Sequence, residues 1–236
     1  MEGIIPPNTK AIKRAYKEEY MISAKLIGYT QPSIHVGAST PEELISYAAR
    51  VSNPSNQENY DTAEGLLKYC IRNKHFSIFE MVNAVVQIKA PRDITRQMLR
   101  HRSFSFQEFS QRYSDEIEFC DREVRMQDKT NRQNSEECTD VGLIQEWNDL
   151  LEGSVAEVKA EYLNMRKAGV AKEVARVLLP EGLTLSTLYA NGTLRSWMHY
   201  LEVREDISTQ KEHRMLANKI REALEPVFPT VLGIKV

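Results

Sequence analysis

The residues best suited to chemistry in this sequence are cations gathered in one short segment. Residues 92–112 contain five arginines against two acids; they are Arg92, Arg96, Arg100, Arg102 and Arg112, against Asp93 and Glu108. Like charges this dense disfavour a helix unless acids or bound anions compensate them. Guanidinium groups bind phosphates through paired hydrogen bonds of fixed geometry. The segment therefore predicts phosphate-bearing ligands, with a solvated basic face paired to acids elsewhere as the alternative.

Aromatic residues alternate with these cations, at Phe104, Phe106, Phe109 and Tyr113. They suit either base stacking on a nucleic acid or the core side of the same segment. The 236-residue chain has a formal net charge of -2, which gives no support to bulk electrostatic binding of nucleic acid or of anionic membrane. We therefore expect neither a nucleic-acid polymer nor a membrane as partner.

Activated nucleophiles are not evident in the sequence. Cys70, Cys120 and Cys138 are far apart and form no C-x-x-C pair, so neither a zinc site nor a disulfide framework is indicated. Three reduced thiols and no apolar run of about 20 residues predict a cytoplasmic protein, or one in the host cytoplasm if it is viral. No G-x-G-x-x-G appears, so a Rossmann-type dinucleotide domain is not supported.

The elements that must position the cations are predicted from periodicity and cap residues. Strands are expected over 21–29 and 81–89, and helices from Thr40, from Asp61 with Glu64, and from Pro91 through His101. The polar residues 127–140 are expected to form a surface loop before a long helix over 141–168.

The C-terminal third is expected to contain a helix over 171–179, two short strands around Asn191-Gly192, and helices over 195–204 and 209–224. Strands and helices mix without a βαβ rhythm, which predicts an α+β fold. Residues 1–20 are assigned to an N-terminal extension and residues 21–236 to a single domain.

The spacing within the central segment is specific. Arg100-His101-Arg102 is followed by seven residues and then Ser110, with Gln97 before it and Arg112-Tyr113 after it. This R-H-R-x7-S pattern resembles the defining motif of the flavin-dependent thymidylate synthases, the ThyX family. Three further segments match that family in order: His75-Phe76-Ser77-x-x-Glu80, Ala175-Arg176-x-x-Leu179-Pro180, and Arg195-Ser196 with His199 and Arg204-x-Asp206-x-x-x-Gln210-x-Glu212-x-Arg214.

The resemblance implies a central, mostly antiparallel sheet flanked by helices, in a homotetramer with its sites at subunit interfaces. It implies methylation of dUMP to dTMP, with FAD as carrier and hydride donor, 5,10-methylenetetrahydrofolate as carbon donor and NADPH as reductant. Because reduced flavin carries the one-carbon unit, the protein is expected to supply binding, orientation and electrostatics.

The same resemblance assigns roles to individual residues. Arg204 is the expected catalytic residue, with a guanidinium that stabilises negative charge on the uracil ring. The expected FAD contacts are His75, Ser77, Arg100, His101, Arg102, Glu108, Thr193, Leu194, Arg195 and His199. The expected dUMP contacts are Gln97, Met98, Leu99, Arg100, Glu108, Phe109, Ser110, Gln111, Arg112, Arg176 and Arg204.

Two other functions remain open at this point. One is a nucleic-acid-binding module built on the Arg/Phe segment. The other is a flavin-binding relative that has lost methyl transfer and acts as an oxidase or a structural oligomer.

Overall fold

The computed structural model describes residues 22–233, so the predicted extension over residues 1–20 lies outside the described part of the chain. The described residues group into two compact units. Unit 1 contains residues 89–96 and 109–186, and unit 2 contains residues 24–88, 97–108 and the chain from residue 187 onward. The assignment of residues 21–236 to one domain stays a prediction.

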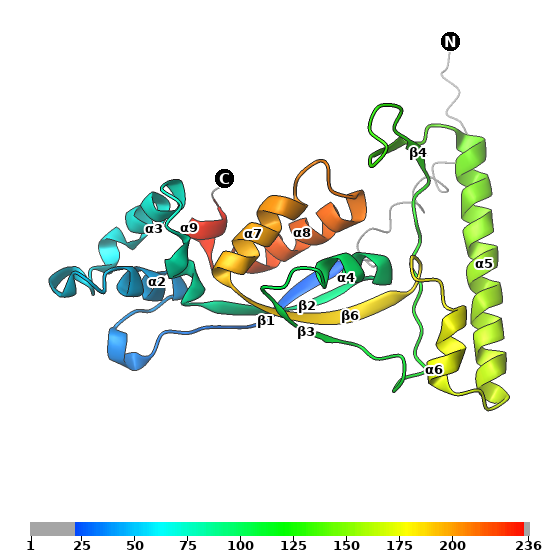
Figure 1. Cartoon of the computed structure of the whole chain (residues 1–236), viewed down its shortest axis with the longest axis horizontal. Helices are drawn as coiled ribbons and strands as arrows, with labels where there is room; N and C mark the ends of the chain where they lie inside the picture. Colours follow the sequence, from blue (N-terminus) through cyan, green and yellow to red (C-terminus); the bar gives the residue numbers. More distant parts are fainter. Residues whose placement is uncertain (1–21, 234–236) are drawn as a thin grey trace, which may run out of the picture. The chain divides into compact units, whose positions relative to one another are not determined.

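A four-stranded sheet forms the centre of unit 2 (Figure 1). Its strands are ordered β1 (Ser23–Tyr29), β2 (Asn83–Pro91), β6 (Leu185–Thr193) and β3 (Ser105–Glu108). Strand β3 pairs antiparallel with β6, and backbone bonds at the strand ends, from Thr30 to Asn83 and from Leu194 to Val82, are those of antiparallel neighbours. The predicted α+β class with an antiparallel sheet is therefore confirmed.

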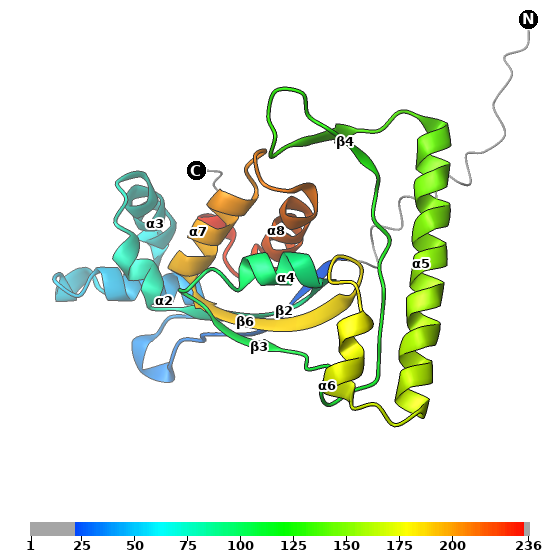
Figure 2. The ribbon, with the colours of Figure 1, turned by 45° about the vertical axis from the view of Figure 1, so that its right-hand side comes forward.

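Helices α7 (Leu194–Arg204) and α8 (Lys211–Leu224) lie over one face of this sheet (Figure 1, Figure 2). Trp197 of α7 is fully buried and donates its indole N–H to the Ala84 carbonyl of β2, at 3.1 Å. Alternate residues of β2, namely Ala84, Val86 and Ile88, are also fully buried. The core of unit 2 therefore lies between the sheet and the helix that carries Arg204.

Three further helices of unit 2 pack on one another: α2 (Pro41–Ala49), α3 (Ala63–Arg72) and α9 (Pro229–Leu232). The predicted start of α2 is confirmed by a complete capping box, in which Glu43 N–H donates to Thr40 Oγ1 at 3.2 Å and Thr40 N–H donates to Glu43 Oε2 at 3.1 Å. Short 3₁₀ segments lie before α2 at Ile34–Val36, between α2 and α3 at Pro54–Asn56 and Tyr60–Thr62, and after α3 at Phe76–Glu80.

Unit 1 contains most of α4 (Arg92–Met98), the hairpin of β4 (Arg125–Gln127) and β5 (Ser135–Glu137), α5 (Val141–Lys167), α6 (Lys172–Ala175) and a 3₁₀ turn, η6 (Arg176–Leu178). Asp115 joins α5 to α6, since its carboxylate accepts from Arg166 of α5 at 2.7 Å and from Lys172 of α6 at 3.1 Å. Gly169, with φ +90°, ends α5 as predicted.

Two predicted helix boundaries are wrong. Asp61 does not cap α3, because the helix begins at Ala63 after the 3₁₀ turn Tyr60–Thr62, and the Thr62 hydroxyl accepts from Arg50 at 2.7 Å instead. Helix α4 ends at Met98 and not at His101. The chain tightens there into i→i+3 bonds, which separates the clustered cations from a continuous helix.

The turn predicted at Asn191-Gly192 is also wrong. Residues 185–193 form one strand and not two. Gly192 is part of that strand and packs closely against the Phe104 ring, since a Cβ on Gly192 would come within 2.5 Å of two ring carbons. The surface loop predicted over 127–140 is confirmed for residues 128–134, which form the turn between β4 and β5, whereas Gln127 and Ser135–Glu137 lie in those strands. The polar groups of the turn bond one another, with the Asp128 carboxylate accepting from the backbone of Thr130 at 2.8 Å and of Asn131 at 2.9 Å.

Candidate active site

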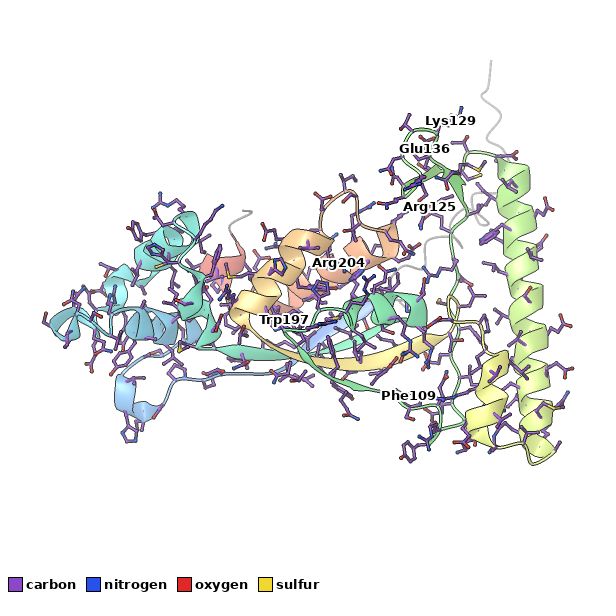
Figure 3. All side chains as sticks on the ribbon, in the orientation of Figure 1. Phe109, Arg125, Lys129, Glu136, Trp197 and Arg204 are labelled. Atoms are coloured by element: carbon purple, nitrogen blue, oxygen red, sulfur yellow. The ribbon has the colours of Figure 1, made fainter. Side chains whose placement is uncertain are left out.

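The turn after α4 brings His101 of unit 2 against Arg204. Arg204 is the last residue of α7 and is labelled in Figure 3. Arg204 Nε donates to His101 Nε2 at 2.9 Å. Because an arginine only donates, Nε2 carries no proton and the ring proton lies on Nδ1. Burial, reinforced by the positive charge of Arg204, lowers the pKa of His101 to about 4. His101 is therefore a neutral acceptor at pH 7 that holds the guanidinium by one edge.

Packed aromatic rings hold the histidine in turn. The His101 ring lies edge-on to Tyr200 at 5.1 Å and to Phe104 at 6.4 Å between centroids. Phe104 makes a further edge contact with Trp197 at 4.5 Å. Such edge-to-face contacts each add about 0.5–1.5 kcal/mol beyond area burial. The position of Arg204 is thus determined by the aromatic core of unit 2.

Unit 2 contains all ten residues that the sequence assigns to FAD. His75 and Ser77 are exposed at the 3₁₀ segment Phe76–Glu80, which packs on α7, and Arg195 of α7 pairs with Glu80. Arg100 and Arg102 are exposed, and within residues 22–233 neither has an ion-pair partner. Exposed cations without acids suit a dinucleotide pyrophosphate.

The other predicted FAD contacts have structural duties as well. Thr193 caps α7, with its hydroxyl accepting from Ser196 N–H at 3.2 Å, and the Leu194 side chain is fully buried. His199 is exposed and lies 3.8 Å from Glu202. Glu108 ends β3. Their contacts with FAD stay predictions.

Unit 1 contains three of the residues assigned to dUMP, namely Ser110, Arg112 and Arg176. The Ser110 hydroxyl accepts from the Arg112 backbone N–H at 3.3 Å. The Arg112 side chain lies 3.5 Å from the carboxylate of Glu173, and Arg176 Nε donates to the Glu173 carbonyl at 3.3 Å. Glu173 therefore contacts the side chains of both Arg112 and Arg176, and guanidinium groups are donors suited to an oxyanion.

The remaining dUMP candidates differ in exposure. Phe109 is 38% exposed, whereas Met98 is fully buried and Gln111 is 6% exposed. Gln97 is half-buried, and its side-chain amide is bonded on both sides, to Gln210 and to His213. Sequence reasoning missed His213 and Tyr200 altogether. The only available signal was polar side chains at core positions of two amphipathic helices.

The described residues offer cations and hydrogen-bond donors rather than a nucleophile. Cys70, Cys120 and Cys138 are buried and free, and burial raises the pKa of Cys120 to about 11. Across residues 22–233 there is no cluster of three or more histidine, cysteine or acidic side chains suited to a metal. No helix in that range is both long and apolar enough to cross a membrane. The arrangement suits binding of an anionic ligand and stabilisation of negative charge.

An α+β fold in which a neutral histidine holds an arginine, with only buried cysteines among the described residues, fits an enzyme that binds an anionic ligand without a cysteine nucleophile. The Thy1 sequence model, described as thymidylate synthase complementing protein, matches residues 26–230. The chain therefore belongs to the flavin-dependent thymidylate synthase family.

Individual relatives agree with this. The chain is 47% identical over 211 residues to a probable flavin-dependent thymidylate synthase of Paramecium bursaria Chlorella virus 1, covering 89% of this chain and 97% of the relative. It is 45% identical over 213 residues to the flavin-dependent thymidylate synthase of Synechocystis, with the same coverage.

A solved structure is similar as well. It is the UMP/dUMP methylase PolB of Streptomyces cacaoi bound with 5-Br dUMP, with a TM-score of 0.75, 25% identity, and coverage of 90% of this chain and 93% of PolB. The resemblance drawn from the motifs is confirmed.

Proposed function

We propose that this chain converts dUMP to dTMP by reductive methylation, with 5,10-methylenetetrahydrofolate as carbon donor and NADPH as reductant, yielding tetrahydrofolate. When bound, FAD supplies the carrier for the one-carbon unit and the hydride. Family membership and the absence of an activated nucleophile among the described residues support this reaction. The single observation that carries it is the bond between Arg204 and neutral His101.

Arg204 is the proposed catalytic residue. His101 occupies its Nε–H, which leaves the two terminal nitrogens of the guanidinium for the ligand. A guanidinium against the uracil carbonyls stabilises the negative charge that develops when C5 acts as a nucleophile. Because His101 is neutral at pH 7, it adds no positive charge that would compete with Arg204 for the ring.

Binding of the rest of the nucleotide is proposed for the other candidates. Ser110, Arg112 and Arg176 of unit 1 are proposed for the phosphate, supported by the contacts of both arginines with Glu173 and by the bond from the Arg112 backbone to the Ser110 hydroxyl. Gln97 and Glu108 offer an amide and a carboxylate for polar edges of the nucleotide. The chain at Met98, Leu99, Arg100, Phe109 and Gln111 is assigned to the same ligand.

The proposed FAD site uses Arg100 and Arg102 for the pyrophosphate. Their exposure and their lack of acidic partners within the described chain support this role. His75, Ser77 and Arg195 are proposed to contact the same cofactor, and His75 also to help hold the folate. Thr193, Leu194, His199, His101 and Glu108 complete the assigned set.

A homotetramer is the proposed assembly, with each site formed by more than one subunit. The 27-residue helix α5 supports association of copies, because Tyr162 is its only buried residue and it exposes large apolar side chains such as Leu150 at 60% and Leu163 at 41%. Light scattering should give four times the 27.2 kDa chain mass. A cytoplasmic setting is proposed from the three free thiols.

The test is anaerobic dTMP formation from dUMP with FAD, NADPH and methylenetetrahydrofolate, against a control without folate. Arg204→Ala should lower the rate of dTMP formation about a hundredfold or more, as expected on loss of a donor that stabilises transition-state charge, while FAD stays bound. Arg72→Ala, which removes an exposed arginine of α3, should leave the rate unchanged. dTMP formation at the parent rate by Arg204→Ala would refute the assignment.

If the parent protein forms no dTMP while dUMP still accelerates NADPH oxidation, the result would instead favour the oxidase-like relative. Binding that depends on polynucleotide length with a steep salt dependence would favour the nucleic-acid module.

A further inference from the structure

A continuous chain of side-chain hydrogen bonds runs through the helical layer of unit 2. The Tyr200 hydroxyl lies 3.1 Å from His213 Nε2, and His213 Nδ1 lies 3.1 Å from Gln97 Oε1. Gln97 Nε2 donates to Gln210 Oε1 at 2.8 Å, and Gln210 Nε2 donates to Glu212 Oε2 at 3.0 Å. The chain thus joins the core of α7 and α8 to a half-buried amide that the proposed function assigns to the nucleotide.

The carboxylate at one end gives this chain a direction. A carboxylate accepts only, so Glu212 turns the Gln210 amide nitrogen toward itself and the Gln210 oxygen toward Gln97. Gln97 then presents nitrogen to Gln210 and oxygen to His213. That oxygen requires a proton on His213 Nδ1, and the bare Nε2 accepts from the Tyr200 hydroxyl. Each amide orientation and the histidine tautomer therefore follow from one acceptor.

Burial holds this arrangement in a single protonation state. His213 and Tyr200 are both fully buried. Burial first, and then the positive charge of Arg204 with the nearby His101, lowers the pKa of His213 to about 3, and burial raises the pKa of Tyr200. A buried polar group that loses its partner costs more than the bond contributed. Neither side chain can reorient without leaving its neighbour unsatisfied.

We propose that His213 is a positioning residue for dUMP, which locks the Gln97 amide with its oxygen toward α8 and leaves one N–H and one lone pair for the nucleotide. This inference rests on the proposed function. A free glutamine amide turns over readily and presents donor and acceptor in either order. A locked amide presents one order and loses no rotational freedom when the nucleotide binds.

The competing explanation is that His213 only fills the core. The two explanations differ in whether its effect on dUMP passes through Gln97. We therefore propose a double-mutant cycle on the full-length, FAD-loaded protein, with His213→Leu, Gln97→Leu and the double variant, and with the dissociation constant for dUMP measured by calorimetry. Additive effects indicate independent residues, and non-additive effects indicate a coupled pair.

His213→Leu should weaken dUMP binding about three- to tenfold, the worth of one hydrogen bond and its geometry. Gln97→Leu should weaken it at least as much, and adding His213→Leu to Gln97→Leu should change it less than twofold. His213→Asn, whose amide N–H falls near the position of Nδ1–H, should restore most of the loss. Leu216→Val, at a fully buried residue of the same helix, is the control for general destabilisation and should leave dUMP binding unchanged.

Tyr200→Phe covers the case in which His213→Leu does not fold, because it removes only the hydroxyl at the end of the chain. It should weaken dUMP binding less than His213→Leu does, and not at all when Gln97 is already Leu. Equal losses with and without Gln97 would overturn the inference, as would an unchanged affinity in folded His213→Leu.

The inference can also fail separately from the proposed function. Unchanged dUMP affinity in Gln97→Leu, with dTMP still formed, would overturn the role of His213 alone. A parent protein that binds no dUMP would overturn both.

Discussion

Replacement of Gly192 by alanine tests how tightly the aromatic core beneath the site is packed. A Cβ on Gly192 would lie 2.5 Å from Phe104 Cδ1 and from Cε1, whereas carbon atoms prefer about 3.5–4.0 Å. The Phe104 ring must therefore shift by about 1 Å. It has little room to do so, because it is 8% exposed and contacts Trp197 at 4.5 Å and Phe106 at 5.9 Å between ring centroids.

Two opposing effects determine the magnitude. Alanine restricts the unfolded chain more than glycine does, which stabilises a compatible site by about 0.4–1 kcal/mol. Overpacking of a well-packed core costs about 1–3 kcal/mol. The cost of overpacking is larger than the gain from the restricted unfolded chain, so we expect Gly192→Ala to lower the free energy of unfolding by about 1–2 kcal/mol.

The matched control is Gly28→Ala in β1. A Cβ there meets only Val85 atoms, at 3.9 Å, which is ordinary van der Waals contact. The lower conformational entropy of the unfolded chain is then not offset by a steric clash in the folded state. Gly28→Ala should therefore change the free energy of unfolding by about zero or raise it by up to about 1 kcal/mol.

The assay is equilibrium urea unfolding at one protein concentration and with saturating FAD, since a ligand that binds only the folded state shifts the midpoint. A second variant, Phe104→Leu, should recover part of the loss when combined with Gly192→Ala, because the smaller side chain removes the clash. A Gly192→Ala protein as stable as its parent would refute the reasoning and place the Phe104 ring elsewhere.

Other expectations follow from single contacts. Arg102→Gln should raise the dissociation constant for FAD at least fivefold through loss of a charge-assisted contact, as measured by flavin fluorescence, and binding equal to the parent's would count against its role. Thr40→Ala should cost about 1 kcal/mol in urea unfolding by breaking the capping box with Glu43; no loss would mean that the cap contributes nothing. His213 has its pKa lowered to about 3 in the folded state and an ordinary value near 6.5 when unfolded, so it contributes stability that is complete above pH 6.5 and lost as pH falls toward 3. The loss should reach at most about 1.4 kcal/mol per pH unit, and His213→Leu should flatten the slope of unfolding free energy between pH 7 and 5; an unchanged slope would contradict the assignment.

Local signals in the sequence predicted much of the secondary structure. The capping box at Thr40, the stop at Gly169 and the alternation of β2 depend on neighbouring residues, and the structure confirms all three. The prediction failed where a distant side chain decides the outcome. Asn191-Gly192 has the composition of a tight turn, yet the glycine is there because the Phe104 ring occupies the space of its Cβ.

The candidate site divides in the same way. The family resemblance assigned roles to Arg204 and to the other arginines, and those assignments stay predictions. The bond from Arg204 to His101 and the tautomer of that histidine were beyond the sequence, since the two residues are 103 positions apart. His213 carried no motif at all, and only its burial beside Tyr200 gives it a role.

The division of the chain into two units bears on cooperativity. The unit boundaries fall after residues 23, 88, 96, 108 and 186, so no single cut separates one unit from the other. Strands β2 and β6 each contain residues of both units. Because both units share these two strands, we expect them to unfold in one transition. The R-H-R-x7-S motif crosses a boundary as well, since Arg102 lies before it and Ser110 after it. Its seven-residue spacer therefore contains the point at which the chain passes from unit 2 to unit 1.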